Sequence, residues 1–309
     1  MSERILVVKL GALGDFIYAL GAMRAIRNHH PDAHIILLTR KPYESLAHQT
    51  GLFNEILLDP KPKLNLFAWL SFKKVLNGLN VSRVYDLQNN DRSEKYFRLF
   101  SPKPEWVGIA KGASHRNSDP DRSRYHSFPG HQKTLALAGI EDVRLDNLDW
   151  LKGDIRSFGV RTPYALLVPG SSAQHPEKRW PFASYRALAE KLIACGVQPV
   201  FIGTLSEKSL IAEISNGLDA LDLSGRTEIG DIAALARSAS CAIGNDTGPM
   251  HIISMTGCPC LMFFCTSKSW IEKHGPQIST AQALETDDLS KISISQAWEI
   301  VESVLRRQF

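Results

Sequence analysis

Residues 242–255 read Ala-Ile-Gly-Asn-Asp-Thr-Gly-Pro-Met-His-Ile-Ile-Ser-Met, which is a short apolar run, a polar turn and the start of a helical pattern. A strand that passes through a short turn into a helix is the repeating step of parallel α/β sheets. The turn also suits an anion, because Asp246 or Thr247 can cap the helix and Gly248 lets a ligand approach the backbone N–H groups. An ordinary capped helix would use the same residues, so the stretch by itself predicts the fold class and leaves a binding site open.

The same alternation extends in both directions from this stretch. Apolar runs separated by helical patterns occur at 5–8, 35–38, 56–58, 84–87, 164–168, 200–202, 221–223, 242–243 and 261–264. Between the first two runs, the apolar residues with helical spacing predict one core-facing stripe, made of Phe16, Ala19, Leu20, Met23 and Ile26. We therefore expect an α/β fold of two Rossmann-like, doubly wound domains that face a central cleft at the carboxyl ends of their strands.

The length of 309 residues suits two domains of roughly 150 residues each. Glycines and a proline in or beside 154–163 make that segment the predicted linker. The expected domains are therefore 1–158 and 159–309.

Two segments fit this plan less simply. The last helix, 294–309, has a capping-box pair in Ser293 and Gln296 and an apolar stripe that would suit packing on either domain. Residues 91–133 lose the alternation and are rich in polar residues. We expect a functional or mobile loop region there, because compact domains seldom contain plain connections of that length.

Composition excludes several classes of protein. With 44% hydrophobic and 22% charged residues, the chain has the composition of an ordinary folded protein, and its net charge is only +4. This charge is too small for a nucleic-acid-binding surface and favours an acidic small molecule. The five cysteines are odd in number and lack C-x-x-C spacing, so we expect buried free thiols in a reducing compartment. The absence of a signal sequence and of any apolar run near the roughly 20 residues of a membrane span predicts a cytoplasmic protein.

Polar residues also follow another strand of the C-terminal half. The run 164–168 leads into Pro169-Gly170-Ser171-Ser172, and Lys178 comes soon after. Hydroxyls, a glycine and the adjacent cations Lys178 and Arg179 beyond a strand end predict a clamp for a diphosphate, in which Lys178 faces the leaving group; a solvated basic loop is the alternative. Glu207 opens the helix after the next strand, where it suits either ribose hydroxyls or the helix dipole. His251 either points at the same phosphate or packs beneath it.

The first predicted strand of the chain is joined to the helix that follows it by Lys9-Leu10-Gly11-Ala12-Leu13-Gly14-Asp15. Two glycines are fewer than the three of a dinucleotide fingerprint, so bound NAD or FAD is not expected. Asp15 is either the N-cap of the next helix or a carboxylate that acts as a general base, and it can be both.

The polar stretch 91–133 holds two further candidates. Asp119-Pro120-Asp121 has the form of a metal-binding D-x-D pair, but arginines flank it and no buried strand precedes it, so we expect no metal site. The basic residues of this stretch, Arg116 and Arg124 among them, either receive an acidic ligand or belong to an ordinary solvated loop.

Four segments together resemble glycosyltransferase family 9, the ADP-heptose:lipopolysaccharide heptosyltransferases and their relatives. They are K-L-G-A-L-G-D at 9–15, P-G-S-S followed by E-K-R-W-P within 169–181, L-S-G-R-T at 223–227, and G-N-D-T-G-P-M-H at 244–251. These segments are spread along nearly the whole chain, and the matching is least clear in 91–163. The sequence departs from the usual family pattern at Pro249 and in 252–256, which leaves the contacts to the donor sugar and base open.

This resemblance implies a GT-B architecture with an acceptor-binding N-terminal domain, a donor-binding C-terminal domain, and no metal or other cofactor. It implies an inverting transfer in which Asp15 deprotonates an acceptor hydroxyl, while Lys178 and the backbone at the start of the helix after 247 stabilise the departing nucleoside diphosphate. The implied catalytic residues are Asp15 and Lys178. The implied donor-binding residues are Gly170, Ser171, Ser172, Lys178, Glu207, Asn245, Asp246, Thr247, Gly248 and His251. The implied acceptor-binding residues are Gly11, Gly14, Arg116 and Arg124.

The expected function is the transfer of a sugar, heptose from ADP-heptose, to the lipopolysaccharide inner core or a related envelope glycan. A lipid-linked acceptor implies a peripheral encounter with the inner face of the cytoplasmic membrane. The resemblance does not fix the sugar, because one family serves several sugars and acceptors. Two alternatives stay open: a GT-B-like epimerase or hydrolase acting on the nucleotide-sugar alone, and a non-catalytic nucleotide-binding protein.

Overall fold

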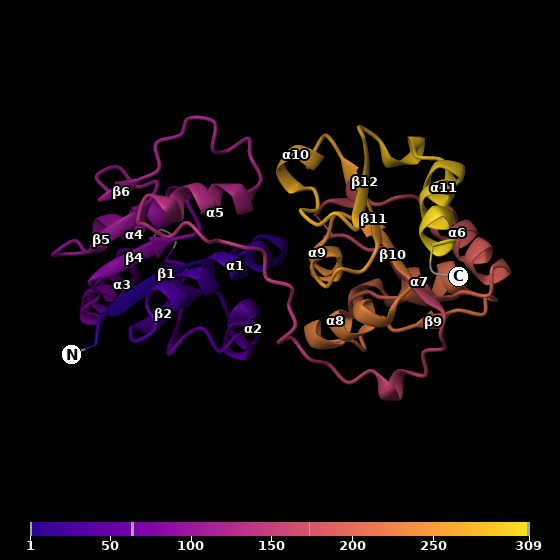
Figure 1. Ribbon diagram of the computed structural model, residues 1–309, viewed down its shortest axis with the longest axis horizontal. Coiled ribbons are helices and arrows are strands. Elements are labelled where there is room, and N and C mark those ends of the chain that lie inside the picture. The colour runs from indigo at the N-terminus through magenta and orange to yellow at the C-terminus, as the bar shows by residue number, and fades with distance from the viewer. Residues whose placement is uncertain (1, 63–64, 173, 308–309) are drawn as a thin grey trace. The chain divides into compact units, whose positions relative to one another are not determined.

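The computed structural model describes residues 2–62, 65–172 and 174–307, and it shows two parallel β-sheets with helices on both faces of each (Figure 1). The chain separates into two compact units, Met1–Asp146 and Asn147–Phe309. Neighbouring strands pair in parallel throughout both sheets. The α/β class with two doubly wound, Rossmann-like sheets, predicted from the alternating apolar runs, is confirmed.

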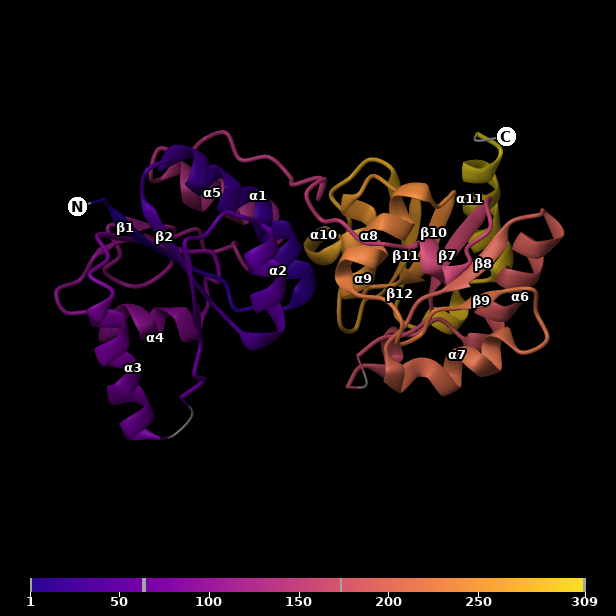
Figure 2. The ribbon, with the colours of Figure 1, turned by 90° about the horizontal axis from the view of Figure 1, so that it is seen from below.

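The first unit is built on a sheet with the strand order β3-β2-β1-β4-β5-β6. Its strands are β1 (Arg4–Val8), β2 (His34–Thr39), β3 (Glu55–Leu58), β4 (Arg83–Asp86), β5 (Glu105–Gly108) and β6 (His115–Arg116). Helices α1 (Leu13–His29) and α5 (Ser127–Ala136) pack together on one face, and α3 (Leu66–Gly78) and α4 (Asp91–Leu99) lie on the other (Figure 2). The short helix α2 (Glu44–Gln49) follows a 3-10 turn at Lys41–Tyr43.

The core of this unit follows from the sequence pattern. Strand β1 is buried along nearly its whole length, as expected of a strand covered on both faces of a parallel sheet. The five residues of the predicted α1 stripe are each no more than 1% exposed: Phe16, Ala19, Leu20, Met23 and Ile26. The predicted stripe is therefore buried, but α1 is covered on more than this one side, since Ile17, Tyr18, Gly21, Ala22 and Ala25 are buried as well.

The second unit repeats the same topology. Its sheet has the order β12-β11-β10-β7-β8-β9, which, counted from the first strand of the unit, is the same Rossmann order as in the first unit. The strands are β7 (Tyr164–Val168), β8 (Gln198–Phe201), β9 (Leu221–Asp222), β10 (Cys241–Asn245), β11 (Cys260–Cys265) and β12 (Ala281–Thr286). The helices are α6 (Phe182–Ala194), α7 (Lys208–Ser215), α8 (Ile229–Ser238), α9 (Gly248–Met255), α10 (Ile271–His274) and α11 (Ile294–Leu305).

The last helix, α11, starts at the predicted capping box, in which the Ser293 hydroxyl accepts from the Gln296 N–H at 3.2 Å. Its buried residues Ala297, Val301 and Leu305 belong to the core of the second unit, against α6, β10 and β11. The sequence left open which of the two domains this helix packs on, and the structure shows that it packs on the C-terminal one.

Residues 147–158 form a segment, here called the strap, that packs on the second unit although the sequence boundary at 158 placed it in the first. Arg237 on α8 donates to the backbone carbonyls of Leu148 at 2.5 Å and Leu151 at 3.0 Å. Gly153 lies so close to the backbone at the start of α8 that a Cβ atom there would overlap it. The division between the units consequently falls at 146/147.

The stretch 91–133 is folded, which corrects the expectation of a long functional or mobile loop. It contains α4, β5, β6 and the first residues of α5. Helix α4 begins at a capping box between Asn90 and Ser93 and turns Tyr96 and Phe97 into the core. These elements are short, so none shows enough turns of a helical or strand period to stand out in the sequence.

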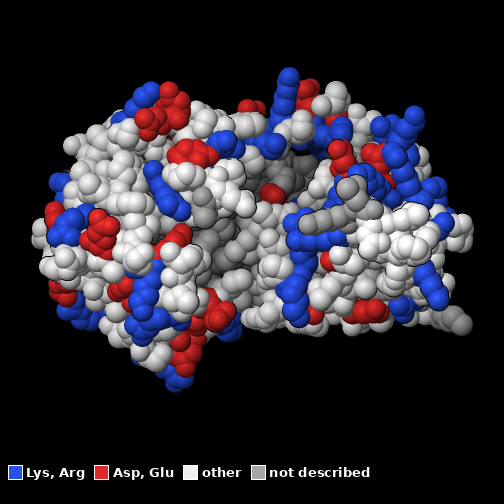
Figure 3. All heavy atoms as spheres, turned by 180° about the vertical axis from the view of Figure 1, so that it is seen from behind, with Lys and Arg blue, Asp and Glu red and all other residues white. Residues whose placement is uncertain are grey.

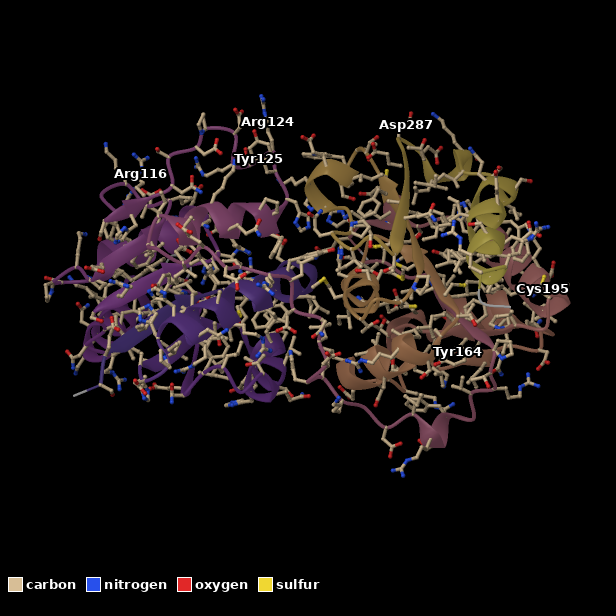
Figure 4. The ribbon with its side chains drawn as sticks, viewed as in Figure 1. Arg116, Arg124, Tyr125, Tyr164, Cys195 and Asp287 are labelled. Carbon is tan, nitrogen blue, oxygen red and sulfur yellow. The ribbon has the colours of Figure 1, made fainter. Side chains whose placement is uncertain are left out.

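Two smaller findings concern the cysteines and the membrane. All five cysteines are free; four are buried as predicted, whereas Cys195, at the C-terminal end of α6, is exposed (Figure 4). Its position at the outer end of a surface helix explains the error, because the apolar residues around it in sequence lie on the inner face of that helix. Among the helices of the described residues, none is both long enough and apolar enough to cross a bilayer.

Candidate functional site

A pocket of about 750 Å³ opens at the carboxyl edge of the second sheet. Its walls come from the segments that follow β7, β8 and β10, and they include residues 170–172, 203–207 and 246–249. Strands β7 and β10 are the central pair at which the strand order reverses, and open α/β sheets bind ligands at such a switch point. The volume falls within the roughly 300–1,000 Å³ typical of small-molecule sites.

Asp246 is the centre of the polar wall of this pocket. Its Oδ2 accepts a hydrogen bond from Lys178 Nζ at 2.7 Å, and its Oδ1 lies 3.0 Å from Nε2 of His251. Because a carboxylate only accepts, Nε2 is the protonated nitrogen of the His251 ring. Burial alone would raise the pKa of Asp246, but the hydrogen bond and charge of His251 and the charge of Lys178 outweigh it and hold that pKa below its ordinary value. The ionised carboxylate therefore fixes the Lys178 ammonium at the pocket wall.

Lys178 and Thr247 are the two donors best placed for an anion. An ammonium has three N–H donors, of which Asp246 accepts one, so further donors of Lys178 remain for ligand oxygens. Thr247 is the N-cap residue of α9, yet its hydroxyl makes no cap hydrogen bond, and its buried Oγ1 has no partner among the described residues. Leaving a buried polar atom unpaired costs about 1–3 kcal/mol, which a ligand at the N-terminus of α9 would recover.

Asn245, which sequence reasoning assigned to the ligand, lies beneath the pocket and holds its walls together. The side chain is fully buried, its Nδ2 donates to the carbonyls of Pro169 at 2.9 Å and Gly170 at 3.0 Å, and its Oδ1 accepts from the Trp180 N–H at 2.9 Å and the Tyr185 hydroxyl at 3.1 Å. These four bonds use both donors and both lone pairs of the amide. The side chain therefore ties the loop after β7 to β10 and α6. His251 is buried and contacts Asp246, and its part in donor binding stays a prediction.

Arg179 joins the two ends of the segment that follows β7; it is one of the adjacent cations of the predicted clamp and lines the pocket, although it was not named among the donor-binding residues. Its guanidinium donates Nε to Ser171 Oγ at 3.0 Å and Nη2 to the Ser171 carbonyl at 3.2 Å, and Ser171 Oγ in turn donates to the His175 carbonyl at 2.9 Å. Gly170, Ser171 and Ser172 all line the pocket, as predicted. The signal for Arg179 was present in the run E-K-R-W-P, where it directly follows Lys178.

Glu207 serves as a helix cap and also lines the pocket. Its Oε2 accepts from the backbone N–H and the hydroxyl of Thr204, each at 2.8 Å, in a capping box at the 3-10 turn Leu205–Glu207. A Cβ at 170 would overlap the Glu207 carboxylate, so a larger residue there would require the Glu207 side chain to move. Near Glu207, Leu205 gives the pocket a partly apolar compartment. Gly225 and Thr227, from the segment L-S-G-R-T at 223–227, also line the pocket.

In the first unit, the corresponding switch point lies between β1 and β4, and Asp15 stands beside it. Asp15 is the third residue of α1, and the N-cap position is Ala12, so the N-cap reading of Asp15 is wrong. Gly14 is the second residue of the same helix. Gly11 has φ +104° and lies directly under the Tyr43 ring, where a Cβ would collide with that ring. The two glycines thus shape the turn that presents the Asp15 carboxylate.

Buried charged and polar groups line the rest of this edge. The Lys9 ammonium is buried and donates to the Leu87 carbonyl at 3.1 Å; burial lowers its pKa, and the nearby charges of Asp15 and Asp86 oppose that shift. Burial raises the pKa of Asp86 to about 6, and burial together with the Lys9 charge lowers the pKa of His131 to about 3. Among the described residues, the buried polar atoms without a hydrogen-bond partner include Thr39 Oγ1, Asp59 Oδ2 and Asn89 Oδ1 on this unit. Such unpaired atoms are typical of a surface completed by a polar ligand.

The two predicted acceptor arginines are exposed and make local contacts (Figure 4). Arg116 Nε lies 3.4 Å from the Ile109 carbonyl, and Arg124 pairs with Asp121 at 3.2 Å. Asp119 pairs with Lys133 at 3.1 Å, so each carboxylate of Asp119-Pro120-Asp121 has a cationic partner. Within the described ranges, no three His, Cys, Asp or Glu side chains are grouped in a way that could hold a metal ion. The acceptor role of both arginines stays a prediction.

Comparison with known proteins gives the family from a sequence profile and the fold from solved structures. The profile of "Glycosyltransferase family 9 (heptosyltransferase)" matches residues 70–271, well over half of the chain. A solved glycosyl transferase of family 9 from Veillonella parvula superposes with a TM-score of 0.83 at 21% identity, covering 99% of this chain and 97% of that one. The Escherichia coli ADP-heptose lps heptosyltransferase II superposes with a TM-score of 0.76 at 19% identity, covering 99% of each chain.

Among curated relatives, the lipooligosaccharide heptosyltransferase 2 of Haemophilus influenzae is 28% identical over 95 residues. That match covers 29% of this chain and 28% of the relative, so it spans less than a third of either protein. The structural likeness extends over the whole chain and supports the fold.

Proposed function

Because the chain belongs to glycosyltransferase family 9, we propose that it transfers a sugar, heptose from ADP-heptose, to the lipopolysaccharide inner core or a related envelope glycan. We propose further that the transfer inverts the anomeric centre, needs no metal or other cofactor, and takes place in the cytoplasm in peripheral contact with the inner face of the membrane. The observation that carries the proposal is the pocket wall in which Asp246 fixes Lys178 beside the unpaired hydroxyl of Thr247. The names of the matched relatives support heptose as the sugar.

The donor is proposed to bind in the pocket of the second unit. Its diphosphate accepts hydrogen bonds from Lys178, the Thr247 hydroxyl and the free N–H groups at the start of α9, all of which favour negative charge. The nucleoside occupies the partly apolar compartment near Leu205, with Glu207 available to its ribose hydroxyls. Lys178 and α9 thereby stabilise the charge that develops on the departing diphosphate.

Asp15 is proposed as the general base. Its carboxylate takes the proton of an acceptor hydroxyl, the freed oxygen attacks the anomeric carbon, and the bond from that carbon to the diphosphate breaks with its electron pair leaving on ADP. Attack from the face opposite the leaving group inverts the centre. Asp15 lies in the first turn of α1, directly after β1 and near the carboxyl edge of the first sheet, where open α/β sheets bind ligands, and this location supports the role.

The first test is ligand stabilisation. At a concentration one hundred times its dissociation constant, a nucleoside diphosphate should stabilise the folded chain by about 2.7 kcal/mol, and ADP should act at lower concentration than UDP or GDP. The measurement is the thermal unfolding midpoint across a panel of nucleoside diphosphates. If none of them raises the midpoint at saturation, the donor site is wrongly assigned.

The second test separates a transferase from an enzyme that acts on the nucleotide-sugar alone. ADP should be released from ADP-heptose only when an extracted acceptor is present, and added EDTA should not change the rate. Release without acceptor would instead indicate a hydrolase, and a changed sugar would indicate an epimerase. Binding of ADP with no release under any condition would indicate a non-catalytic protein.

The third test uses matched pairs of variants. Asp15→Asn should lower kcat by about 10²- to 10⁴-fold and leave ADP binding intact, whereas Asp91→Asn, in the first turn of α4, removes the same charge and should change neither. Lys178→Ala should weaken ADP binding by about tenfold or more, as expected for loss of a charged hydrogen bond. The exposed Lys208→Ala should leave it unchanged. Equal effects within either pair would count against the assigned role.

A further inference from the structure

One helix of the first unit carries an unusual amount of exposed apolar surface. Of the eight large hydrophobic side chains that are exposed in the described part of the chain, four belong to α3. Phe67 is 82% exposed, Leu66 67% and Leu70 54%. A helix at the surface of a soluble domain normally carries polar residues on its outer face, so this surface needs an explanation.

The exposed residues are not needed to hold α3 in place. The opposite side of the helix packs on the core through Phe72, Leu76 and the partly buried Trp69. The helix start is capped independently, since the Asn65 side chain accepts from the Ala68 N–H at 3.1 Å. The outer face is therefore preformed and free to contact something else. Figure 2 shows α3 at the lower left, where it projects from the rest of its unit.

Two lysines lie on the same side of the helix as the apolar residues. At about 100° per residue, Lys73 and Lys74 fall within the same sector of about 120° as Leu66, Phe67 and Leu70. These five residues are called the α3 surface below. Both lysines are exposed. Figure 3 shows, on its right side, the unit that bears α3, with an uncharged area that has many blue basic atoms and some red acidic atoms around it.

The charged residues of α3 and of the sequence on either side of it have one sign only. No Asp or Glu occurs in the sequence from 60 to 85, whereas Lys61 and Arg83 add to the two lysines of the helix. A preformed helix with Phe and Leu on one sector, flanked by lysines and free of acidic residues, is the pattern of helices that lie in the interface of an anionic bilayer. Large apolar side chains that protrude from a helix can insert among lipid acyl chains, and lysines beside them are attracted to negatively charged headgroups.

We propose that the α3 surface docks the protein on an anionic lipid bilayer. Leu66, Phe67 and Leu70 enter the boundary between headgroups and acyl chains, and Lys73 and Lys74 contact the lipid phosphates. The inference assigns a surface to the peripheral contact of the proposed function. Its evidence is independent of the sugar-transfer chemistry, and the test below separates the two.

The experiment measures partition of the full chain onto vesicles by flotation. We expect binding to vesicles of phosphatidylglycerol mixed with phosphatidylethanolamine, and much weaker binding to phosphatidylcholine alone. Phe67→Ser/Leu70→Ser should lower the partition coefficient at least about tenfold. Lys73→Ala/Lys74→Ala should lower it roughly twentyfold on the anionic vesicles, at about fivefold for each lysine, and high salt should remove most of the effect of this second variant.

Matched controls come from the same unit. Leu137→Ser removes another exposed leucine, and Lys95→Ala/Lys111→Ala removes two exposed charges. Both should partition like the parent. ADP stabilisation should be the same in the parent and all four variants, which verifies folding and keeps the result separate from the donor-site proposal.

Two outcomes would overturn the inference. One is equal vesicle binding by the parent and both α3 variants, or none by any of them. The other is self-association of the parent that the α3 variants abolish without any lipid present, since the surface would then be an interface between copies of the chain. Loss of transfer with normal vesicle binding would refute only the enzymatic proposal.

Discussion

Replacing Asn245 by alanine tests whether the centre of the proposed donor site supports the pocket or contacts the ligand. The amide joins two carbonyls of the loop after β7, one backbone N–H at the start of α6 and one tyrosine hydroxyl. Alanine would remove all four bonds and leave their partners buried.

The expected loss of stability is large. At about 1 kcal/mol for each net hydrogen bond, four bonds amount to about 4 kcal/mol, with a range of roughly 2–6 kcal/mol. For a unit of this size, a loss of 1 kcal/mol lowers the unfolding midpoint by about 2–4 °C, so we expect a decrease of roughly 8–16 °C. Few single substitutions exceed this effect.

The assay is urea unfolding followed both by circular dichroism and by tryptophan fluorescence, to which the buried Trp180 beside the amide contributes together with the other five tryptophans of the chain. The control is Asn147→Ala, an exposed asparagine of the same unit, which should change the unfolding free energy by no more than about 0.5 kcal/mol. ADP affinity is measured well below the unfolding midpoint. If Asn245 only supports the pocket, the folded Asn245→Ala protein should still bind ADP, and any loss of affinity should come from movement of the loop after β7.

An unfolding free energy for Asn245→Ala within about 0.5 kcal/mol of the parent would refute the scaffold role. The reasoning would fail most clearly if stability were unchanged and ADP binding were lost. That combination would mean that the side chain faces the ligand, as the sequence alone suggested.

Three further changes have defined outcomes. Arg179→Lys keeps the charge but loses the forked geometry that closes the loop, so calorimetry should show ADP binding weakened about threefold to tenfold. The pKa of His131 is lowered to about 3, so the stability that its neutral form contributes is present above about pH 6.5 and is lost as the pH falls toward 3, by up to roughly 5 kcal/mol. His131→Gln should therefore flatten the fall in unfolding free energy between pH 6.5 and 4; Asp86, whose raised pKa acts in the opposite direction, is unchanged in both proteins. Gly11→Ala should cost about 1–3 kcal/mol from backbone strain, add a collision with Tyr43, and lower kcat more than it affects ADP binding.

Each of these changes has a control in the same protein. The exposed Arg156→Lys should leave ADP binding as it is, and the exposed His48→Gln should keep the pH profile of the parent. Gly51→Ala, at φ +66° with open space around it, should show strain without a collision and so cost less than Gly11→Ala. Identical pH profiles for parent and His131→Gln, or equal costs at the two glycines, would contradict the corresponding argument.

Elements with a strong local pattern could be predicted from the sequence. The α1 stripe and the central strands repeat with a clear period, and the Ser293–Gln296 cap has a local signature. The strands β5, β6 and β12 could not be found in this way. β5 (E-W-V-G) and β6 (H-R) do not form aliphatic runs, and β12 lies at the sheet edge, where its side chains are only partly buried.

The candidate site was predictable in its motifs and not in its side-chain contacts. The sequence identified Lys178, Asp246 and Thr247 from their places after strand ends, and all three line the pocket. The bond between Lys178 and Asp246 joins residues 68 positions apart, so no local pattern could indicate it. For the same reason, neither the inward-facing amide of Asn245 nor the position of Tyr43 over Gly11 could be predicted.

The strap has a consequence for exchanging parts between relatives. A chimaera joined at 158/159 would lay the 147–158 segment of one parent on the α8 of another, and the hydrogen bonds from Arg237 to Leu148 and Leu151 would then cross the junction. Joining at 146/147 instead keeps this donor and its acceptors from one parent, together with the close backbone approach at Gly153. If the second unit binds the donor as proposed, donor specificity is best transplanted as residues 147–309, with the strap treated as part of that unit rather than as a neutral hinge.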